Sequence, residues 1–223
     1  AALGLETSLF PSLFSAGTPI GGLRNEWALP GLPAGTPVAV CGHDHICAAF
    51  AAEALLGRGH ALDSMGTAES LVGALAERRL GEAEWLSGFS FGCHVHPGKL
   101  YWASGLSTSG GAVEWLRGIL GDPPLGYAEL EALLAQEPDQ PGDLIFLPYL
   151  AGSGSPHNDP KARGAFIGLG SAHSRADLYR AVLEGTAFEI EYARQKAGAL
   201  TGSPVTQLAL AADQSGCVGL PGG

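Results

Sequence analysis

The sequence predicts an α/β protein. An apolar run from Val38 to Cys41 ends at Gly42, and an alanine-rich helical pattern follows it up to Leu56, which is the order strand, tight turn, helix. Glycine accounts for 34 of the 223 residues, about twice the usual share. Such a composition is typical of chains with many tight turns and close backbone approaches, and it argues against a helical bundle.

The N-terminal part of the chain is expected to be irregular. Prolines and paired glycines interrupt residues 1–29, which indicates loops with at most one short helix. A turn-rich segment then enters a buried strand at Thr36 to Cys41. Reversal of the chain after that strand needs a permissive backbone, which Gly42 supplies. The helix that follows, Asp44 to Leu56, stops at Gly57.

Short strands dominate the next stretch. His60 to Leu75 has the alternation of a β-hairpin, or of two short strands, around a Gly-Thr turn, and its first strand ends at Met65. The charged residues of Glu77 to Glu84 indicate a surface loop. Two further strands are expected at Phe89 to His96 and at Lys99 to Ser104.

The second half of the chain shows a capping box. Ser174, followed three residues later by Asp177, predicts the start of a helix that runs to about Ala199. The remaining expected elements are two amphipathic helices and two strands, at Val113–Leu120, Tyr127–Gln136, Leu144–Tyr149 and Thr206–Leu210.

Charge limits the partners of this chain. The net charge is −10 and only three lysines are present, so the chain repels phosphates and has no basic run to bind nucleic acid or an anionic membrane surface. No apolar run reaches the ~18 residues of a spanning helix. No basic segment followed by an apolar core opens the chain. We therefore expect a cytoplasmic protein with no nucleic-acid and no membrane partner.

The four cysteines, Cys41, Cys47, Cys93 and Cys217, form no Cys-x-x-Cys pair. A disulfide framework would be unusual in a chain of this length with so few cysteines. Free thiols in a reducing compartment are the better interpretation.

Asp44 is the first candidate for chemistry. It follows the turn at the end of a predicted strand, where ligands gather in open α/β sheets, and a carboxylate there can act as a general base. A structural alternative is that Asp44 caps the following helix. His43 and His45 raise the alternative of a metal site. Against it, adjacent residues on a turn point in different directions, and no His-x-x-x-His or Cys-x-x-Cys partner lies nearby.

Two glycine-containing segments suit phosphate. Gly66 and Thr67 form a turn whose glycine and hydroxyl can approach phosphate oxygens closely, although an ordinary β-turn is the structural alternative. Gly110 and Gly111 lead into a helix whose N-terminus offers free backbone N–H groups to an anion, or they form a simple loop-to-helix entry. The absence of a P-loop, a protein-kinase catalytic loop and a Gly-x-Ser-x-Gly stretch argues against those three kinds of site.

Four segments in a fixed order carry a family resemblance. They are GHDH with SMGTAES (42–45 and 64–70), LFPSLFSAGTPIGGL (Leu9–Leu23), DLIFLPYLAGSGSPHNDPKARGAFIGL (Asp143–Leu169) and RADLYRAVLEGTAFEIEYAR (Arg175–Arg194). Together they resemble the FGGY carbohydrate kinases over nearly the whole chain, up to about Leu210. One such motif would be weak, whereas four in the order of the family are specific.

The resemblance implies an actin-like ATPase fold of the ribonuclease H-like type, in which two lobes clasp ATP and sugar, and which is incomplete here. Residues 1–57 would be the C-terminal end of the N-terminal lobe, and residues 58–223 the truncated C-terminal lobe. The first phosphate loop of the family, Asp-x-Gly-Thr or Asp-x-Gly-Ser, is absent. Ala211-Ala212-Asp213 does not match the Gly-Gly turn that closes over adenine in the family.

The resemblance also implies an activity, the ATP-dependent phosphorylation of a hydroxyl of a sugar, polyol or sugar acid. Asp44 would accept the proton of that hydroxyl and, together with His45, bind the substrate. ATP and Mg²⁺ would be the cofactors, with the metal held largely through ATP and not by protein ligands of this chain. The implied ATP contacts are Gly66, Thr67, Gly110, Gly111 and Glu114. The family more often has a neutral residue near Glu114, which weakens that assignment.

Much of the sugar- and base-binding machinery of the family is missing, and the chain opens with Ala1 instead of methionine. We therefore expect an internal fragment of a kinase for a small-molecule sugar or polyol, one that does not turn over alone. A homodimer is a further expectation. One alternative is a non-catalytic actin-like nucleotide-binding module, against which the presence of Asp44 argues. Another is a metal-dependent hydrolase that uses His43, Asp44 and His45.

Overall fold

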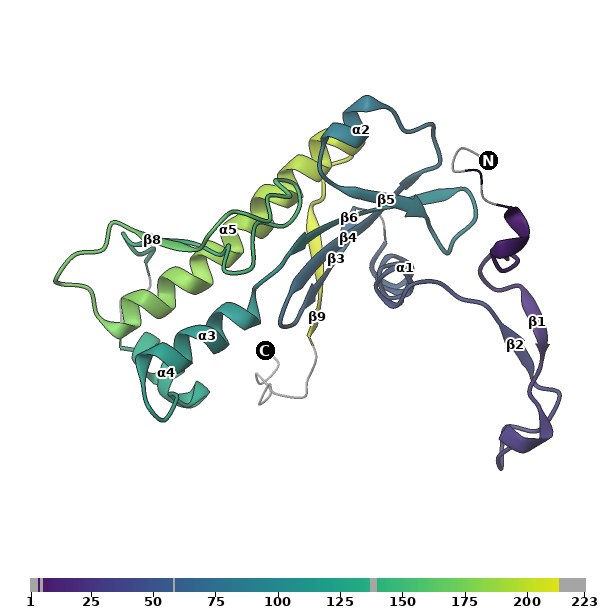
Figure 1. Cartoon of the computed structure of the whole chain (residues 1–223), viewed down its shortest axis with the longest axis horizontal. Helices are drawn as coiled ribbons and strands as arrows, with labels where there is room; N and C mark the ends of the chain where they lie inside the picture. Colours follow the sequence, from purple (N-terminus) through teal and green to yellow (C-terminus); the bar gives the residue numbers. More distant parts are fainter. Residues whose placement is uncertain (1–3, 5, 58, 137–139, 213–223) are drawn as a thin grey trace.

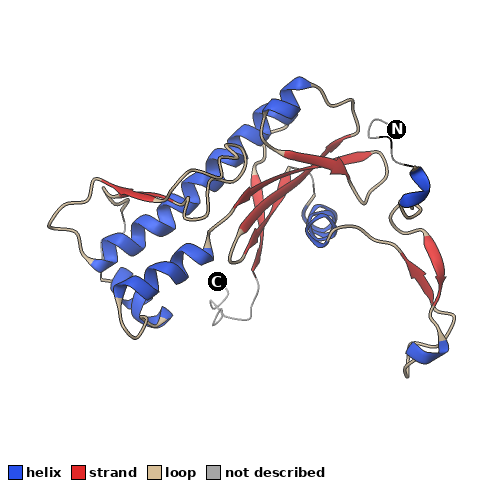
Figure 2. Cartoon of the chain, in the orientation of Figure 1, coloured by secondary structure: helices blue, strands red, loops and turns tan. Residues whose placement is uncertain are grey.

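The centre of the structure, a computed structural model that describes residues 4, 6–57, 59–136 and 140–212, is a five-stranded sheet with helices on both faces (Figure 1). This architecture confirms the predicted α/β class (Figure 2). The strand order is β5-β6-β4-β3-β9. The strands are β3 (His60–Met65), β4 (Glu69–Ala76), β5 (Ser90–Cys93), β6 (Lys99–Leu106) and β9 (Gln207–Ala212).

The sheet combines an antiparallel meander with one parallel strand. β3 pairs with β4, β4 with β6, and β6 with β5, all antiparallel. β9 lies parallel to β3, with Ala61 opposite Leu208. Parallel neighbours need a long connection between them. Here this connection is the whole segment from β4 to the end of α5.

Alternation along the strands gives the sheet two apolar faces, because successive side chains of a strand point to opposite sides. Leu71 and Trp102 pack on one side with Ala193 of α5 (Arg175–Thr201). Val72 packs on the other side with Ile46 of α1 (Asp44–Leu56). Each face therefore buries its own apolar cluster, and α1 and α5 are separated by the sheet.

A second core joins α5 to the remaining helices. Leu116 of α3, Leu130 of α4, Phe146 of β7 and Val182 of α5 are all buried in it. Figure 1 shows α3 and α4 beside one half of α5. The bounds of these elements are α3 (Gly110–Leu120), α4 (Tyr127–Leu134), β7 (Ile145–Leu147) and its antiparallel partner β8 (Ala165–Ile167).

The residues before α1 extend away from the sheet (Figure 1). They form a two-stranded ribbon of β1 (Pro19–Gly22) and β2 (Pro37–Ala39), with 3-10 turns at Thr7–Leu9 and Asn25–Trp27. The predicted buried strand at Thr36 to Cys41 is thus wrong in length and in burial, because β2 has three residues and all are exposed. Its apolar residues pair only with β1 and lie outside the two cores of the sheet.

A short helix replaces part of the predicted loop at Glu77 to Glu84. This helix, α2, spans Glu82–Leu86. The carboxylate of Glu84 is buried because it has two partners, the N–H of Gly81 at 2.7 Å and the guanidinium of Arg78 at 2.7 Å. A buried charge needs such pairing. The local sequence pattern did not predict these partners of Glu84.

The other helix ends agree with the predictions or lie close to them. Ser174 and Asp177 form the predicted capping box of α5. The helix ends at Thr201, and the following residue, Gly202, adopts the left-handed conformation. α3 begins at Gly110, before the predicted start at Val113. None of the described helices combines the length and apolar character needed to cross a bilayer.

Candidate active site

The turn that carries Asp44 lies at the start of α1. His43 is the N-cap residue, and its Nδ1 accepts a hydrogen bond from the N–H of His45 at 3.2 Å. Asp44 is the first helical residue, and its Oδ1 accepts from the same N–H at 2.8 Å. The suggestion that Asp44 itself is the N-cap is therefore wrong by one position, because His43 has that role.

The side chain of Asp44 is 84% exposed. The hydrogen bond from the His45 backbone is the main cause that lowers its pKa. Desolvation opposes this effect, and the rings of His43 and His45 add to the lowering. The carboxylate is consequently ionised at neutral pH. Nδ1 of His43 also lies 2.8 Å from Oδ1 of Asp44. The tautomer of His43 therefore decides whether Nδ1 donates a hydrogen bond to this carboxylate or accepts one from the N–H of His45.

Gly42 has a packing role in place of the conformational role predicted for it. Its φ lies outside the left-handed region, but a Cβ at this position would lie only 2.4 Å from Cγ1 of Val95. The absence of a side chain therefore lets the Asp44 turn pack closely against Val95. A glycine is required here by contact with a distant segment and not by the turn itself.

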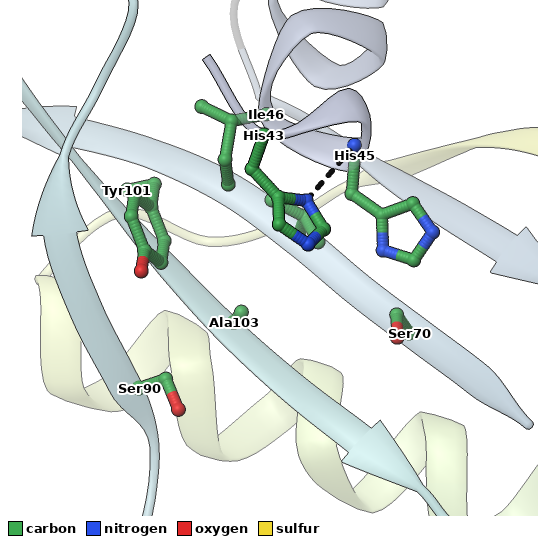
Figure 3. A pocket seen from close by; sticks show the side chains of 8 residues that line it. His43, His45, Ile46, Ser70, Ser90, Tyr101 and Ala103 are labelled. Carbon is green, nitrogen blue, oxygen red and sulfur yellow. Dashed lines mark hydrogen bonds between the residues drawn. The ribbon is translucent and has the colours of Figure 1, made fainter.

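A pocket of about 290 Å³ opens beside this turn (Figure 3). His43 and His45 line it from the start of α1, and Ser70, Ser90 and Tyr101 line it from β4, β5 and β6. Its volume is near the lower end of the roughly 300–1,000 Å³ of small-molecule sites. Hydroxyl and imidazole groups above an apolar floor suit a small polar ligand; the floor consists of Ile46, Val72 and Ala103.

The pocket contains His45, as predicted for a substrate contact, but Asp44 is not among its lining residues. The sequence motifs did not indicate that Ser70, Ser90 and Tyr101 line this pocket. They come from three strands, and only the pairing of those strands brings them together. The alternation of β6 was the one available signal, because it places Tyr101 on the face opposite Trp102.

The side chains of His43, Asp44 and His45 converge more than expected. Each offers one ligand atom, and these atoms all lie within 4.8 Å of one another. The two imidazole rings meet edge to face, with 5.2 Å between their centroids. The expectation that adjacent side chains of this turn point apart is thus wrong, and the set matches the kind of donors that Zn²⁺ accepts.

The turn between β3 and β4 is bound to the start of α3. The backbone N–H groups of Ser109, Gly110 and Gly111 donate to the carbonyl oxygens of Thr67, Gly66 and Thr67, each at 3.0 Å. Four residues that the sequence singled out therefore lie together. These bonds also correct one expectation, since the first N–H groups of α3 already have carbonyl acceptors and are not free for an anion.

Close approach explains the two glycines at the start of α3, Gly110 and Gly111. A Cβ on Gly110 would lie 2.7 Å from the oxygen of Gly66, and one on Gly111 would lie 3.1 Å from the oxygen of Thr67. Thr67 is exposed. In the part of the chain that the structure describes, neither its backbone N–H nor its hydroxyl has a hydrogen-bond partner. These two donors suit an oxyanion such as phosphate.

Glu114 also lies on α3, but its carboxylate has partners of its own. It accepts hydrogen bonds from the Tyr127 hydroxyl at 2.8 Å and from Arg117. The bond from Tyr127, followed by the effects of Arg117, lowers the pKa of Glu114. Among the described residues, no hydrogen bond connects this carboxylate to the Gly66–Thr67 turn.

The comparisons with known proteins agree on one family. Residues 65–211 match the C-terminal domain of the FGGY family of carbohydrate kinases. The xylulose kinase of Klebsiella pneumoniae is 32% identical over 197 residues, and the glycerol kinase of Thermus brockianus is 36% identical over 205 residues. The chain belongs to the FGGY family of carbohydrate kinases. These alignments cover 85% and 88% of this FGGY chain, but the chain spans only 38% of each relative.

Solved structures extend the same similarity to the fold. The crystal structure of a xyloylose kinase from Brucella ovis has a TM-score of 0.79 at 30% identity, and it covers 96% of this FGGY chain and 43% of that chain. The xylulose kinase of Rhodospirillum rubrum has a TM-score of 0.75 at 26% identity, with 94% and 46% covered. FGGY sugar kinases have an actin-like ATPase fold with two lobes, so the described residues form part of that fold, as predicted.

Proposed function

We propose that this FGGY chain is part of an ATP-dependent kinase that phosphorylates a hydroxyl of a sugar, polyol or sugar acid. The observation that carries the proposal is the exposed carboxylate of Asp44 beside a pocket of imidazole and hydroxyl groups, in a chain of this family. Relatives named xylulose kinase and glycerol kinase support this class of small-molecule substrate. A cytoplasmic location belongs to the same proposal, because ATP is supplied there.

In this proposal Asp44 is the general base, and His45 contacts the substrate from the pocket. Transfer of a phosphoryl group to a hydroxyl needs an acceptor for the hydroxyl proton and an in-line arrangement of the reacting oxygens. The transition state of such a transfer is loose, so the hydroxyl keeps its proton until late in the reaction. A carboxylate with a lowered pKa is a weak base, and a weak base suffices for a late proton transfer.

Thr67 supplies the phosphate contact in the proposed nucleotide site, through its free N–H and hydroxyl, with Gly66 beside it. Gly110 and Gly111 support this turn from behind by hydrogen bonds to its carbonyl oxygens. Glu114 suits a ribose hydroxyl better than a phosphate, because its carboxylate repels anions. Mg²⁺ bound through the nucleotide would neutralise charge on the transferring group, and we assign it no ligand in this chain.

We also propose the division of the chain at residue 57. Residues 1–57 would end the N-terminal lobe of the kinase, and residues 58–223 would belong to its C-terminal lobe. The family match over residues 65–211 supports the second part of this division. The proposed base, Asp44, and the proposed phosphate turn, Gly66–Thr67, then come from different lobes. A reaction between two bound substrates would be expected between those lobes.

Asp44→Asn in the gene product that contains this chain tests the proposal. Substrates would be a panel of ketoses, glycerol and sugar acids, with ADP release as the readout. We expect kcat to fall by about 10²–10⁴, with the Kd of ATP nearly unchanged, because the amide keeps the shape of the carboxylate but accepts no proton. Asp122→Asn, at another exposed aspartate, is the control. Turnover at the wild-type rate in Asp44→Asn would remove Asp44 from the mechanism.

The metal-dependent hydrolase remains a second candidate because the ligand atoms of His43, Asp44 and His45 lie within 4.8 Å of one another. Metal analysis of the purified protein separates the two functions. Stoichiometric zinc that disappears in His45→Ala would favour the hydrolase. Protein purified without zinc that releases ADP when given a sugar, ATP and Mg²⁺ would favour the kinase.

A further inference from the structure

Three buried polar side chains lie directly beneath the turn between β3 and β4. Asp63, Glu69 and Ser109 are only 4%, 3% and 7% exposed. Across the two strands Asp63 pairs with Leu71 and Met65 with Glu69, so both carboxyls point to the same face of the sheet. The start of α3 meets that face and contributes Ser109.

The hydroxyl of Ser109 joins the helix to the hairpin by donating a hydrogen bond to Oε2 of Glu69. A serine at the N-cap usually accepts a bond from an amide in the first turn of its own helix, but Ser109 makes no such bond. Its side chain is used across the interface instead. Three backbone hydrogen bonds to Gly66 and Thr67 and one side-chain hydrogen bond to Glu69 therefore hold the start of α3 against the β3–β4 hairpin.

The two carboxyls share this buried position without a positive partner. Within the described residues neither Asp63 nor Glu69 forms an ion pair, and Oδ1 of Asp63 has no hydrogen-bond partner. Burial, followed by the nearby carboxyl group of Glu69, raises the pKa of Asp63 to about 7. A neutral acid is far less costly to bury than a second carboxylate.

We propose that Glu69 is a positioning residue of the nucleotide site, which holds the start of α3 against the Gly66–Thr67 turn through the hydroxyl of Ser109. The inference rests on the proposed function for its role in ATP binding. The contact itself is a property of the fold and is testable without ATP.

Hydrogen–deuterium exchange of residues 107–113 in this chain tests the contact, because the amides of Ser109, Gly110 and Gly111 form the junction. Glu69→Ala removes the acceptor, and we expect these amides to exchange faster by about tenfold, the scale for loss of one buried hydrogen bond. Ser109→Ala should reproduce this effect with the loss of a single oxygen. Glu69→Gln retains a carbonyl acceptor for Ser109 and should restore slow exchange.

Glu84→Ala is the matched control, because Glu84 is a buried carboxylate of α2 that is 7% exposed and is bound to Gly81 and Arg78 instead. It should speed exchange in α2 and leave residues 107–113 unchanged. Unchanged exchange at the junction in both Glu69→Ala and Ser109→Ala would overturn the inference. Equal acceleration throughout β4, β6 and α5 in Ser109→Ala would overturn it as well, because that pattern means general destabilisation.

The Kd of ATP, measured on the gene product that contains this chain, separates the two proposals. Glu69→Ala should raise it, and Glu69→Gln should return it close to the wild-type value. Wild-type protein that binds no ATP would refute the proposed function and leave the junction intact. Wild-type protein that binds ATP, with the same Kd in Glu69→Ala, would refute the positioning role alone.

A second inference comes from an independent contact, between two thiols on either side of the Asp44 turn. Cys41 precedes the turn, Cys47 lies in the first turns of α1, and their Sγ atoms are 3.1 Å apart. Both are free, and Cys41 is exposed.

We propose that Cys41 and Cys47 form a site of reversible oxidation to a disulfide, with a low-molecular-weight disulfide such as oxidised glutathione as the oxidant. The exposed Cys41 thiolate attacks one sulfur of the reagent and releases a first glutathione. Cys47 then loses its proton to solvent and attacks the Cys41 sulfur, which releases a second glutathione. The two cysteines give up two electrons, the two released thiolates take up two protons, and the new S–S bond closes a ring that contains Asp44.

Thiol counting and mass spectrometry in a Cys93→Ser/Cys217→Ser background test this site, and the background removes the other two cysteines, of which Cys217 lies outside the described residues. After oxidised glutathione we expect loss of both thiols without an adduct, and recovery of both with dithiothreitol. Cys47→Ser in the same background should instead keep one glutathione on Cys41. Two unreacted thiols, or two separate adducts, would overturn the proposal.

Discussion

The backbone N–H of Gly110 donates to the carbonyl oxygen of Gly66 over 3.0 Å. This bond ties the first residue of α3 to the tip of the β3–β4 hairpin, and it requires a helix residue without a side chain at the point of contact. The free donors of Thr67 are held in place by this packing. The proposed phosphate contact is therefore a tertiary feature, although its residues form recognisable local motifs.

Gly110→Ala should destabilise the protein. The added Cβ would lie 2.7 Å from the oxygen of Gly66, so the helix or the turn must move, at a cost of about 1–3 kcal/mol. Gly118→Ala in the same helix is the control, because a Cβ there meets nothing within 4 Å, and it should add up to about 1 kcal/mol of stability through helix propensity. Urea unfolding measures both changes. A stabilising Gly110→Ala would contradict the close approach.

Gly42→Ala should disturb the Asp44 turn, because the added Cβ would lie 2.4 Å from Cγ1 of Val95. We expect a loss of about 1–3 kcal/mol in the free energy of unfolding. Val95→Ala should recover part of this loss when combined with Gly42→Ala, since it removes the clashing methyl group. A double-mutant cycle by urea unfolding gives the coupling between the two positions. Strictly additive effects would mean that the two residues do not meet.

Asp63→Asn should change how stability depends on pH. The folded pKa of about 7 exceeds the ordinary value of 3.8, so between these values the folded state binds more protons than the unfolded state. The contribution of Asp63 to the stability of the wild type therefore falls as pH rises from about 4 to 7. Asparagine keeps the shape of the neutral acid without this titration. We subtract the unfolding free energy of the wild type from that of the variant at each pH. This difference should be higher at about pH 8 than at about pH 5, by on the order of 2 kcal/mol.

The comparison for Asp63→Asn is urea unfolding of both proteins at the two pH values. Titrating groups that do not interact with Asp63 are common to both proteins and cancel in the difference. A difference between variant and wild type that does not depend on pH would show that Asp63 has no raised pKa.

Ser174→Ala should weaken the start of α5. The Ser174 hydroxyl accepts from the N–H of Asp177 at 3.3 Å, and the Asp177 carboxylate accepts from the N–H of Ser174 at 2.6 Å. Loss of the cap should lower the free energy of unfolding by about 1 kcal/mol, and Ser174→Asn should restore most of it. Ser203→Ala, just beyond the other end of the helix, is the control. Equal effects of Ser174→Ala and Ser203→Ala in thermal unfolding would argue against the cap.

Local signals predicted the helices well. α1 has the predicted limits, Asp44 and Leu56, because an alanine-rich helix that stops at a glycine needs no distant partner to define its ends. The exposed position of β2 and the helix at Glu82–Leu86 escaped prediction. A hydrophobic pattern does not encode polar contacts such as the ion pair of Glu84 in α2 with Arg78. It also does not show that β2 pairs with β1 outside the cores of the sheet.

Local sequence motifs predicted only part of the candidate site. The motifs located His45, Thr67 and the paired glycines of α3, because these residues belong to short continuous segments. Ser90 and Tyr101 share a pocket with His45 only because β5 and β6 pair beside β4. Their side chains are too common in strands to be recognised singly as ligand contacts.

The sequence by itself determined the α/β class, the capping box of α5, the family, and the segments in which a carboxylate and a phosphate turn should be sought. These features follow from spacing and residue type within short stretches. The tertiary structure decided that β9 returns to lie parallel to β3, that Glu69 meets Ser109 beneath the turn, and that Cys41 touches Cys47 across Asp44. Such contacts depend on which faces are buried together, and burial is a property of the whole chain and not of a local pattern.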